Sequence, residues 1–222
     1  MKAPEKVGKY VVIEGHDGTG KTSQVNKVRK LLASQGIASV ELSEPAKDPA
    51  DGETDEVLIA DAIRTILKNG SLTRDATTNL FLFSAARHEL WHQKAIPALK
   101  LGKWVVAARN YYSTLAYQGY GEGLDLELIH NMTATATDNH YMNPDIAIIL
   151  DLDDEEVRLK RIEARGELEN PDTFESKGGD FQQRVKDAYI NIASTYKIPI
   201  VSASGSITEV TDEIWSIVEP RI

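Results

Sequence analysis

Short runs of consecutive apolar residues alternate along the chain with longer segments in which apolar residues recur every three or four positions. The short runs predict buried strands, and the periodic segments predict amphipathic helices. Strands are expected at residues 10–13, 38–42, 104–107, 145–150 and 198–201. Helices are expected at residues 23–33, 58–67, 73–101, 124–137, 154–164, 181–196 and 210–218. The third helix is expected to be one long helix or two helices broken at Pro97.

This alternation predicts an α/β fold, with a five-stranded parallel sheet and helices on both faces, because a strand buried on both faces is apolar throughout. Ligands of such sheets bind just outside the carboxyl ends of the strands. The segments expected to be loops at those ends are residues 15–21, 43–45, 109–119 and 151–153. Because no interdomain linker interrupts the chain, residues 1–222 are expected to form one domain.

The first predicted strand leads into a glycine-rich segment with the spacing Gly-x-x-x-x-Gly-Lys-Thr. Its members are Gly15, His16, Asp17, Gly18, Thr19, Gly20, Lys21 and Thr22. With a strand before it and a helix after it, this spacing predicts a phosphate-binding loop. Backbone N–H groups would surround the anion, Lys21 would reach the β- and γ-phosphates, and the Thr22 hydroxyl would bind Mg²⁺. A chance match of a glycine-rich turn is the alternative, and both flanking elements argue against it.

Composition narrows the class of protein. The net charge of −9 argues against broad nucleic-acid binding, which usually requires a basic face. The absence of cysteine excludes a disulfide framework and thiolate chemistry. Residues 1–9 lack the apolar core of a signal peptide, and no apolar run is long enough for a membrane span. We therefore expect a soluble cytoplasmic protein with no nucleic-acid or membrane partner.

A P-loop predicts triphosphate binding but no particular reaction, so other clusters must indicate the acceptor. Phe83 and Arg87 are four residues apart and share one face of a predicted helix. A ring beside a guanidinium is suited to hold a nucleobase by stacking and hydrogen bonding. The alternative is that Phe83 belongs to the core and Arg87 pairs with a nearby carboxylate.

A second cluster follows the third predicted strand. Arg109 stands at the carboxyl end of that strand, where an arginine is well placed to bind a second phosphate. Tyr117 and Gln118, a few residues later, offer a ring face and an amide. The alternative is a solvated loop with incidental polar residues.

A third cluster is basic, which is conspicuous in an acidic chain. Its members are Arg158, Lys160, Arg161 and Arg165. The three arginines recur on one helix face and are expected to point at one place, where they would stabilise an anionic transition state from a loop that can close. The alternative is a solvated helix with ordinary ion pairs to Glu155 and Glu163.

Taken together, the motifs resemble those of the thymidylate kinase family. The matching segments, in family order, are residues 15–22, 44–45, 82–87, 109 with 113–119, 143–145 with 150–153, 161–167 and 181–185. They run over nearly the whole chain. The Ala-Tyr-Gln-Gly run at residues 116–119 and the Arg-Gly-Glu run at residues 165–167 are much more specific than the P-loop.

The resemblance implies a P-loop kinase with a small lid over about residues 161–180. The implied reaction transfers a phosphoryl group from MgATP to dTMP and gives dTDP and ADP. The residues implied to act in catalysis are Lys21, Arg109, Arg161, Arg165 and Asp17. Gly18 stands where some relatives carry an arginine in the P-loop, so the chain resembles the subtype whose arginine comes from the lid. The family also implies a homodimer formed through long helices.

On the donor side, the resemblance implies that residues 15–22 bind ATP, with Lys21 on its phosphates. The implied cofactor is Mg²⁺, bound by Thr22, with Asp17 or Glu44 as further candidates. Asp17 would also accept a hydrogen bond from the 3′-hydroxyl group of the acceptor sugar. The P-loop would in this way serve both substrates.

On the acceptor side, the resemblance assigns a larger set of residues. The residues implied to bind dTMP are Asp17, Glu44, Pro45, Phe83, Arg87, Arg109, Thr114, Tyr117 and Gln118. Phe83 would stack on thymine, while Arg87 and Gln118 would bind the base. Arg109 would bind the acceptor phosphate, and Tyr117 would crowd the 2′ position and so favour deoxyribose.

The chain departs from the family pattern in several places. Ala108 replaces the acid of the family's Asp-Arg pair, and Ser43 replaces the arginine before Glu-Pro. The loop at residues 46–55 is longer and more acidic than expected, and no basic residue lies near Asn170. Loss of a carboxylate near the metal would lower activity, change the metal or acceptor preference, or require compensation by another group.

Other functions therefore remain as alternatives. One is a kinase for another deoxynucleotide or for a deoxynucleoside. Another is a catalytically weak, binding-only relative, because of Ala108. A guanine-specific switch would need an Asn-Lys-x-Asp element. The pair Asn26-Lys27 lies within the first predicted helix and lacks the aspartate.

Overall fold

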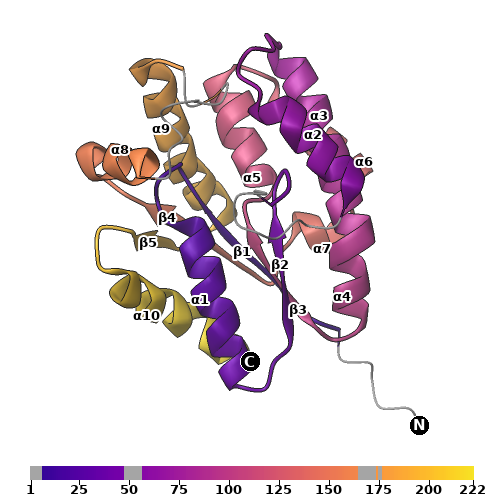
Figure 1. Cartoon of the computed structure of the whole chain (residues 1–222), viewed down its shortest axis with the longest axis vertical. Coiled ribbons are helices and arrows are strands. Elements are labelled where there is room, and N and C mark those ends of the chain that lie inside the picture. The colour runs from indigo at the N-terminus through magenta and orange to yellow at the C-terminus, as the bar shows by residue number, and fades with distance from the viewer. Residues whose placement is uncertain (1–6, 48–56, 165–173, 175–176) are drawn as a thin grey trace.

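The computed structural model describes residues 7–47, 57–164, 174 and 177–222 (Figure 1). Its centre is a sheet of five parallel strands in the order β2-β3-β1-β4-β5. The strands are β1 Tyr10–Gly15, β2 Ser39–Ser43, β3 Trp104–Ala108, β4 Ile146–Asp151 and β5 Ile200–Ser202. Each of them overlaps a strand predicted from the apolar runs, and the predicted fold class is confirmed.

Helices connect the strands along the chain. The α-helices are α1 Lys21–Ser34, α2 Leu58–Lys68, α3 Ala76–Leu90, α4 Ile96–Lys100, α5 Tyr111–Thr114, α6 Leu126–Ala136, α7 Asn139–Met142, α8 Glu155–Glu163, α9 Gly179–Tyr196 and α10 Ile207–Val218. The remaining helical elements are the π-helices η2 Trp91–Ala95 and η3 Leu115–Gly121 and the 3-10 turn η4 Glu219–Arg221. The short helix α7 was not predicted.

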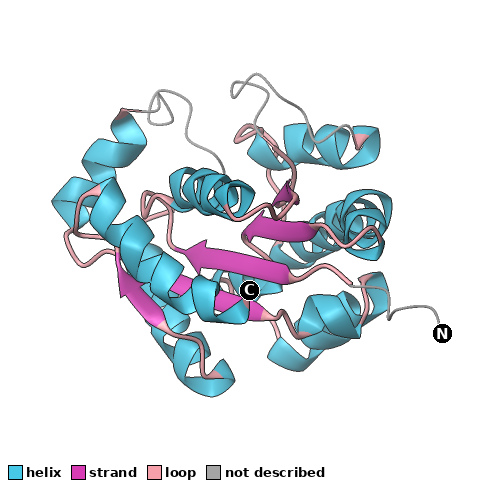
Figure 2. Ribbon diagram, turned by 90° about the horizontal axis from the view of Figure 1, so that it is seen from below, coloured by secondary structure: helices cyan, strands magenta, loops and turns pink. Residues whose placement is uncertain are grey.

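Helices lie on both faces of the sheet, as the view along its edge shows (Figure 2). The side chains of the central strand β1 alternate between the two faces, as the period of a strand requires. Val11 and Ile13 pack in the core beneath α1 and α10, whereas Tyr10 and Val12 pack in a larger core beneath the other helices. All four side chains are fully buried. The strand that leads into the P-loop is therefore fixed on both sides.

The helical segment predicted at residues 73–101 has a different form from both alternatives. It is continuous as α3, η2 and α4, and the irregularity lies before Pro97 rather than at it. The Ile96 N–H donates to the Trp91 carbonyl, which is a π-type hydrogen bond. A proline lacks an N–H and its ring crowds the carbonyl four residues earlier, so a widened turn just before it accommodates the ring.

The segment predicted as a loop at residues 109–119 is largely helical, and the loop prediction is wrong. Asn110 caps α5, because its side-chain oxygen accepts the Tyr112 N–H at 2.9 Å. The chain continues into the π-helix η3, whose tyrosine and glutamine side chains, Tyr117 and Gln118, are buried. Polar residues and glycines indicated a loop, but here they face the interior of the site instead of solvent.

The strand register brings three connections together at the carboxyl end of the sheet. Ala108 at the end of β3 lies beside Ile13 of β1 and Ser43 of β2. The P-loop, the Glu44-Pro45 segment and Arg109 therefore start from neighbouring positions.

Two expectations cannot be placed. The proposed lid falls mostly on residues 165–173 and 175–176, and the acidic loop falls mostly on residues 48–56, all outside the described residues. Among the helices that the structure describes, none has the length and apolar character needed to cross a membrane.

Candidate active site

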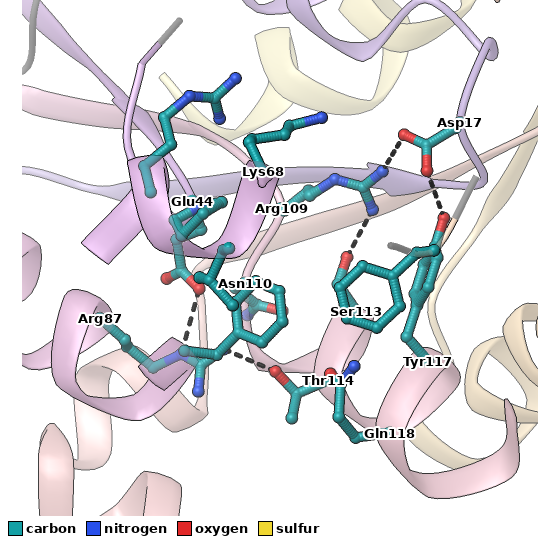
Figure 3. Close-up of a pocket in the computed structure, with 15 residues that line it drawn as sticks. Asp17, Glu44, Lys68, Arg87, Arg109, Asn110, Ser113, Thr114, Tyr117 and Gln118 are labelled. Carbon is teal, nitrogen blue, oxygen red and sulfur yellow. Dashed lines mark hydrogen bonds and ion pairs between the residues drawn. The ribbon is translucent and has the colours of Figure 1, made fainter. Parts of the chain in front are cut away.

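A pocket opens at the carboxyl ends of β1, β2 and β3 (Figure 3). It holds about 710 Å³ of empty space, including its open mouth. Its lining residues are Asp17, Glu44, Pro45, Arg64, Leu67, Lys68, Phe83, Arg87, Arg109, Asn110, Ser113, Thr114, Tyr117, Gln118 and Phe174. Every residue that the family resemblance assigned to dTMP is among them. The structure thus brings together residues from Asp17 to Phe174, which lie more than 150 positions apart in the sequence.

One wall of the pocket is a buried network around Arg87, which we call the base wall: Glu44, Arg87, Thr114 and Tyr141. The Arg87 Nε donates to Glu44 Oε2 at 3.1 Å and to the Tyr141 hydroxyl at 2.8 Å, and Nη2 donates to Thr114 Oγ1 at 2.8 Å. The Tyr141 hydroxyl donates in turn to Glu44 Oε1. The guanidinium is 1% exposed, and its Nη1 has no hydrogen-bond partner among the described residues.

Burial and pairing act against each other in this wall. Burial raises the pKa of Glu44, and the charge of Arg87 and the Tyr141 hydrogen bond only partly offset that rise. Burial lowers the pKa of Arg87, but Glu44 and Tyr141 together outweigh burial and leave the net shift of that pKa upward. The arginine is therefore charged at neutral pH, and it holds Glu44 through a charge-assisted hydrogen bond. Phe83 lies half-buried beside this wall.

The opposite wall, which we call the phosphate wall, is formed by Asp17, Arg109, Ser113 and Tyr117. Arg109 donates to Asp17 Oδ1 and, at 2.8 Å, to Ser113 Oγ. The Tyr117 hydroxyl donates to Asp17 Oδ2 at 2.7 Å. Burial alone would raise the pKa of Asp17, but Arg109 and then Lys21 outweigh it and hold the pKa well below its usual range. The carboxylate is thus ionised and oriented.

The backbone of Arg109 is strained. Its φ of 73° lies in the left-handed region, which costs a residue with a side chain roughly 1–3 kcal/mol. The Arg109 N–H donates to the Ile13 carbonyl at 3.1 Å, which continues the β1–β3 pairing to the point where the chain turns. Such strain persists where surrounding contacts fix the residue, and the turn directs the guanidinium into the pocket (Figure 3).

Sequence reasoning missed Glu14, which organises the phosphate wall from below. Its carboxylate accepts the Asn110 N–H at 2.7 Å, the Ser113 N–H at 3.1 Å, the Ser113 hydroxyl at 2.8 Å and the Tyr189 hydroxyl at 3.1 Å. Ser113 and Tyr189 are also acceptors for Arg109. The signal that was available is an acidic residue in an otherwise apolar strand, because a buried carboxylate requires several donors.

The pocket contains further residues that the motifs did not indicate. Arg64 and Lys68 bring positive charge from α2 to the pocket. Phe174 contributes a ring whose centroid is 5.8 Å from that of Phe83 and 5.9 Å from that of Tyr117. An amphipathic helix with a basic residue at its end gives no sequence signal for a site, because exposed cations are common there.

The P-loop itself has the geometry that its spacing predicts. The loop turns on Gly15, Gly18 and Gly20, which have φ values of 141°, 85° and 91°. A Cβ atom on Gly15 would lie 2.4 Å from the Leu150 carbonyl oxygen, so no other residue fits there. The helix α1 begins at Lys21, directly after the loop, and its first N–H groups and positive dipole end favour an anion.

The side chains of Lys21 and His16 in this loop have defined hydrogen-bond partners. Lys21 Nζ donates to the Gly15 carbonyl at 2.9 Å and to the His16 carbonyl at 2.8 Å, and it lies 3.9 Å from Asp17 Oδ1. Burial lowers the pKa of His16 to about 4, although Asp17 opposes the shift. The neutral ring is paired at Nε2 with Gln182 Oε1 at 2.8 Å, so Nε2 carries the proton.

The donor set for Mg²⁺ is smaller than the family resemblance implies. Asp17 and Glu44 both accept hydrogen bonds from an arginine and a tyrosine, so their oxygens are already engaged. Among the described residues, no three or more His, Cys, Asp or Glu side chains group to hold a metal ion. The half-buried Thr22 remains at the start of α1. A hydroxyl with nucleotide phosphates and waters is a set that suits Mg²⁺.

The basic cluster of α8 does not point at one place, and that expectation is wrong for the arginines described. Arg158 pairs with Glu155 and donates to the Asp17 carbonyl at 3.3 Å. Arg161 donates to the Ala203 carbonyl at 3.1 Å, after β5. Residues three apart are still about 60° apart around a helix, and here that angle directs them to different elements. Arg165 lies outside the described residues.

Comparisons with known proteins agree with this geometry. The family model described as thymidylate kinase matches residues 13–214. A thymidylate kinase of Carboxydothermus hydrogenoformans is 34% identical over 212 residues, covering 96% of this chain and 97% of the relative. A thymidylate kinase of Legionella pneumophila is 33% identical, covering 97% and 96%.

A solved structure supports the fold. The crystal structure of thymidylate kinase from Ehrlichia chaffeensis superposes with a TM-score of 0.71 at 24% identity, covering 96% of this chain and 99% of that one. At that identity the likeness is evidence of fold alone, and it matches the five-stranded parallel sheet. The family model and the curated relatives carry the assignment further: this chain belongs to the thymidylate kinase family and is an ATP-dependent nucleoside-monophosphate kinase.

Proposed function

We propose that this kinase transfers the γ-phosphoryl group of ATP to dTMP through the residues of the described pocket, with dTDP and ADP as products. The observation that carries the proposal is that all the residues expected to bind dTMP line a single cavity, with Asp17 belonging to both that cavity and the P-loop. No covalent intermediate is required, because phosphoryl transfer is catalysed by positioning and electrostatic stabilisation.

In this proposal the base wall recognises thymine. Arg87 has a buried Nη1 without a partner in the described part of the chain, and an unsatisfied donor of this kind costs about 1–3 kcal/mol. A shift of the side chain toward a base carbonyl would satisfy it. Phe83 offers the stacking face. Gln118, which donates to Glu122 at 3.2 Å, also lines the pocket.

The phosphate wall then positions the acceptor for transfer. Arg109 binds the dTMP phosphate, and Asp17 accepts a hydrogen bond from the 3′-hydroxyl. Tyr117, fixed by its bond to Asp17, leaves no room for a 2′-hydroxyl and so selects deoxyribose. Lys21, 3.9 Å from Asp17, meets the charge that develops on the donor phosphates.

The metal and the lid complete the proposed mechanism. Thr22 would hold Mg²⁺ together with the phosphates of ATP, and the bound ion would neutralise phosphate charge. Arg161 and Arg165 belong to the lid proposed over residues 161–180 and contribute positive charge to the transferring group. Arg161 would have to leave the Ala203 carbonyl to do so.

A homodimer is part of the proposal. Helices α2 and α3 expose four large apolar side chains. These side chains are Leu58, Ile59, Ile66 and Phe81, with Leu58 82% exposed. A second copy of the chain would cover them, and sedimentation at micromolar concentration distinguishes dimer from monomer. The proposed location of the enzyme is the cytoplasm, where nucleotide pools are phosphorylated.

The test is a coupled assay of ADP release with dTMP, dUMP, dGMP, dCMP and thymidine as acceptors. We expect dTMP to give the highest kcat/KM. A higher value for thymidine or dGMP would exclude the proposed acceptor. Tight binding of ATP and dTMP without ADP release would instead identify a binding-only relative, the alternative that Ala108 raises.

A further inference from the structure

Arg158 is the one residue of the basic cluster, among those described, that contacts the P-loop. Although it belongs to a charged surface helix, its side chain is only 5% exposed. Its Nε and Nη2 atoms donate to the two oxygens of Glu155 at 2.7 and 2.6 Å. This bidentate pair fixes the plane of the guanidinium and leaves Nη1 directed at the Asp17 carbonyl, 3.3 Å away.

The contact between α8 and the loop is close at the next residue as well. Gly18 has a φ of +85°, and a Cβ atom built there would lie 2.9 Å from Arg158 Cγ and 2.9 Å from the Arg158 carbonyl oxygen. Ile162 Cγ1 would be 3.3 Å away. The loop is therefore pressed against one turn of α8, and the space beside Gly18 is filled by the stem of an arginine from another element.

Asp17 is consequently held by two arginines from opposite sides. Arg109 and Tyr117 bind its carboxylate, and Arg158 binds its main-chain carbonyl. The proposed function uses Asp17 at the point where the acceptor pocket meets the P-loop. A peptide unit held at only one end can rotate, whereas these contacts fix both the backbone and the side chain.

We propose that Arg158 is a positioning residue for phosphoryl transfer. It holds the Asp17 peptide so that the P-loop and the acceptor pocket keep the relative positions needed for reaction. Nothing in the family resemblance assigned this residue; the motif arginines are Arg161 and Arg165. The inference rests on the proposed function, because it acts on the same transfer. Misplacement of reacting groups by about 1 Å costs on the order of a hundredfold in rate, so the expected effect is on kcat.

The experiment compares Arg158→Ala with Lys160→Gln. Lys160 lies on the same helix, carries the same charge and pairs with Glu156, but both side chains of that pair are largely exposed. We expect Arg158→Ala to lower kcat by about ten- to a hundredfold while the KM for dTMP changes less than threefold. Lys160→Gln should stay within twofold of the wild type, because exposed pairs contribute little.

Rescue separates positioning from folding. Guanidinium ion at tens of millimolar should restore part of kcat in Arg158→Ala, and Glu155→Gln should show an intermediate loss, because it removes the anchor of the guanidinium. A kcat within twofold of the wild type in Arg158→Ala would overturn the proposal. A loss of kcat that guanidinium does not restore, and that is matched by a loss of thermal stability, would also overturn the proposal.

A measurement that needs no turnover tests this inference independently of the proposed reaction. Amide hydrogen exchange of residues 15–20 should be faster in Arg158→Ala than in the wild type and in Lys160→Gln. If the wild type released no ADP with dTMP, the proposed function would fail while the exchange result still tested the Arg158 contact. Unchanged exchange in Arg158→Ala would overturn the contact even in a fully active enzyme.

Discussion

The base wall and the phosphate wall stand on opposite sides of one pocket but are built differently. In the base wall, Arg87 and Glu44 are almost fully buried, and Thr114 and Tyr141 also hold the Arg87 guanidinium. In the phosphate wall, Arg109 and Asp17 keep 18% and 27% of their side-chain surface exposed, although Ser113, Tyr189 and Tyr117 also contact them. The charged groups of the base wall are shielded from solvent, whereas those of the phosphate wall are partly open to it.

This difference predicts that the two walls affect different kinetic parameters. A buried, fully packed wall recognises a shape and contributes equally to the bound substrate and the transition state. A partly exposed set of charges can leave its protein partners for phosphate oxygens as charge develops. Changes in the base wall should therefore act on stability and on the KM for dTMP, whereas changes on the phosphate side should act on kcat.

Lys21→Ala should have the largest effect on rate. Lys21 lies beside Asp17, and its ammonium group is expected to meet charge that develops during transfer. Removing one preorganised donor of this kind typically lowers kcat by about 10²–10³. Steady-state kinetics with ATP and dTMP measures it, and Lys30→Ala, an exposed lysine on the same helix, is the matched control. An unchanged kcat would remove Lys21 from the mechanism.

Arg87→Ala should chiefly affect stability and dTMP binding. It would leave Glu44 buried without its cation, and breaking a buried pair in this way costs about 3–5 kcal/mol. We expect a large loss of unfolding free energy in urea and a raised KM for dTMP, with the KM for ATP unchanged. Thr114→Val, which removes one acceptor of Arg87 and keeps the volume, should show a smaller loss of both. An equal rise in both KM values would show a general folding effect.

His16 predicts a pH dependence of stability. Its pKa in the folded protein, about 4, lies below the ordinary value of 6.5, so protons bind the unfolded chain more tightly. Its contribution is complete above pH 6.5 and is lost as the pH falls toward 4, by at most about 3 kcal/mol.

The measurement is the unfolding free energy of the wild type minus that of His16→Asn across this range. His140 is a control of opposite sign. Its pKa is raised by hydrogen bonding to Asp145, so its contribution is present at low pH and is lost as the pH rises through the raised value. A difference for His16→Asn that does not change with pH would show that the ring is not buried as described.

Ala108→Asp should have the smallest effect of these variants. It tests the phosphate side of the pocket near the expected Mg²⁺ site. Ala108 is 6% exposed and lies beside Ser43 in the sheet, so the two departures from the family pattern are neighbours. We expect the aspartate alone to lower the unfolding free energy, because it places a carboxylate at a buried position, and Ser43→Arg to recover part of that loss. A several-fold gain in the Mg²⁺-dependent rate would show that the natural site lacks a metal-side carboxylate.

The apolar pattern and the motifs predicted the parts of this protein that depend on local sequence. The strands follow from continuous apolar runs, and the P-loop follows from spacing plus its two flanks. The residues expected to bind dTMP were found by resemblance. The parallel sheet explains why they meet, because connections that leave the carboxyl ends of neighbouring strands lie at the same end of the sheet.

The features that were missed depend on contacts between distant segments. Glu14 acts through Ser113 and Tyr189, which lie far from it in the sequence. Arg158 and Arg161 share a helix and differ only in what the neighbouring elements present to them. The helical form of residues 109–119 is set by burial against neighbouring helices, chiefly α9, which overrides the turn signals of the local sequence. No pattern of residue types along one segment contains this information.

The close approach of Gly18 to α8 has a consequence for how such an enzyme can change over generations. An arginine cannot enter the loop at position 18 while Arg158 fills the adjoining space, since even a single added carbon would be 2.9 Å from its stem. Replacement of Arg158 alone would not make room, because the carbonyl oxygen of residue 158 would also lie 2.9 Å from the added carbon. The present arrangement is therefore separated from a loop-borne arginine by a joint change of the loop and of the backbone of α8.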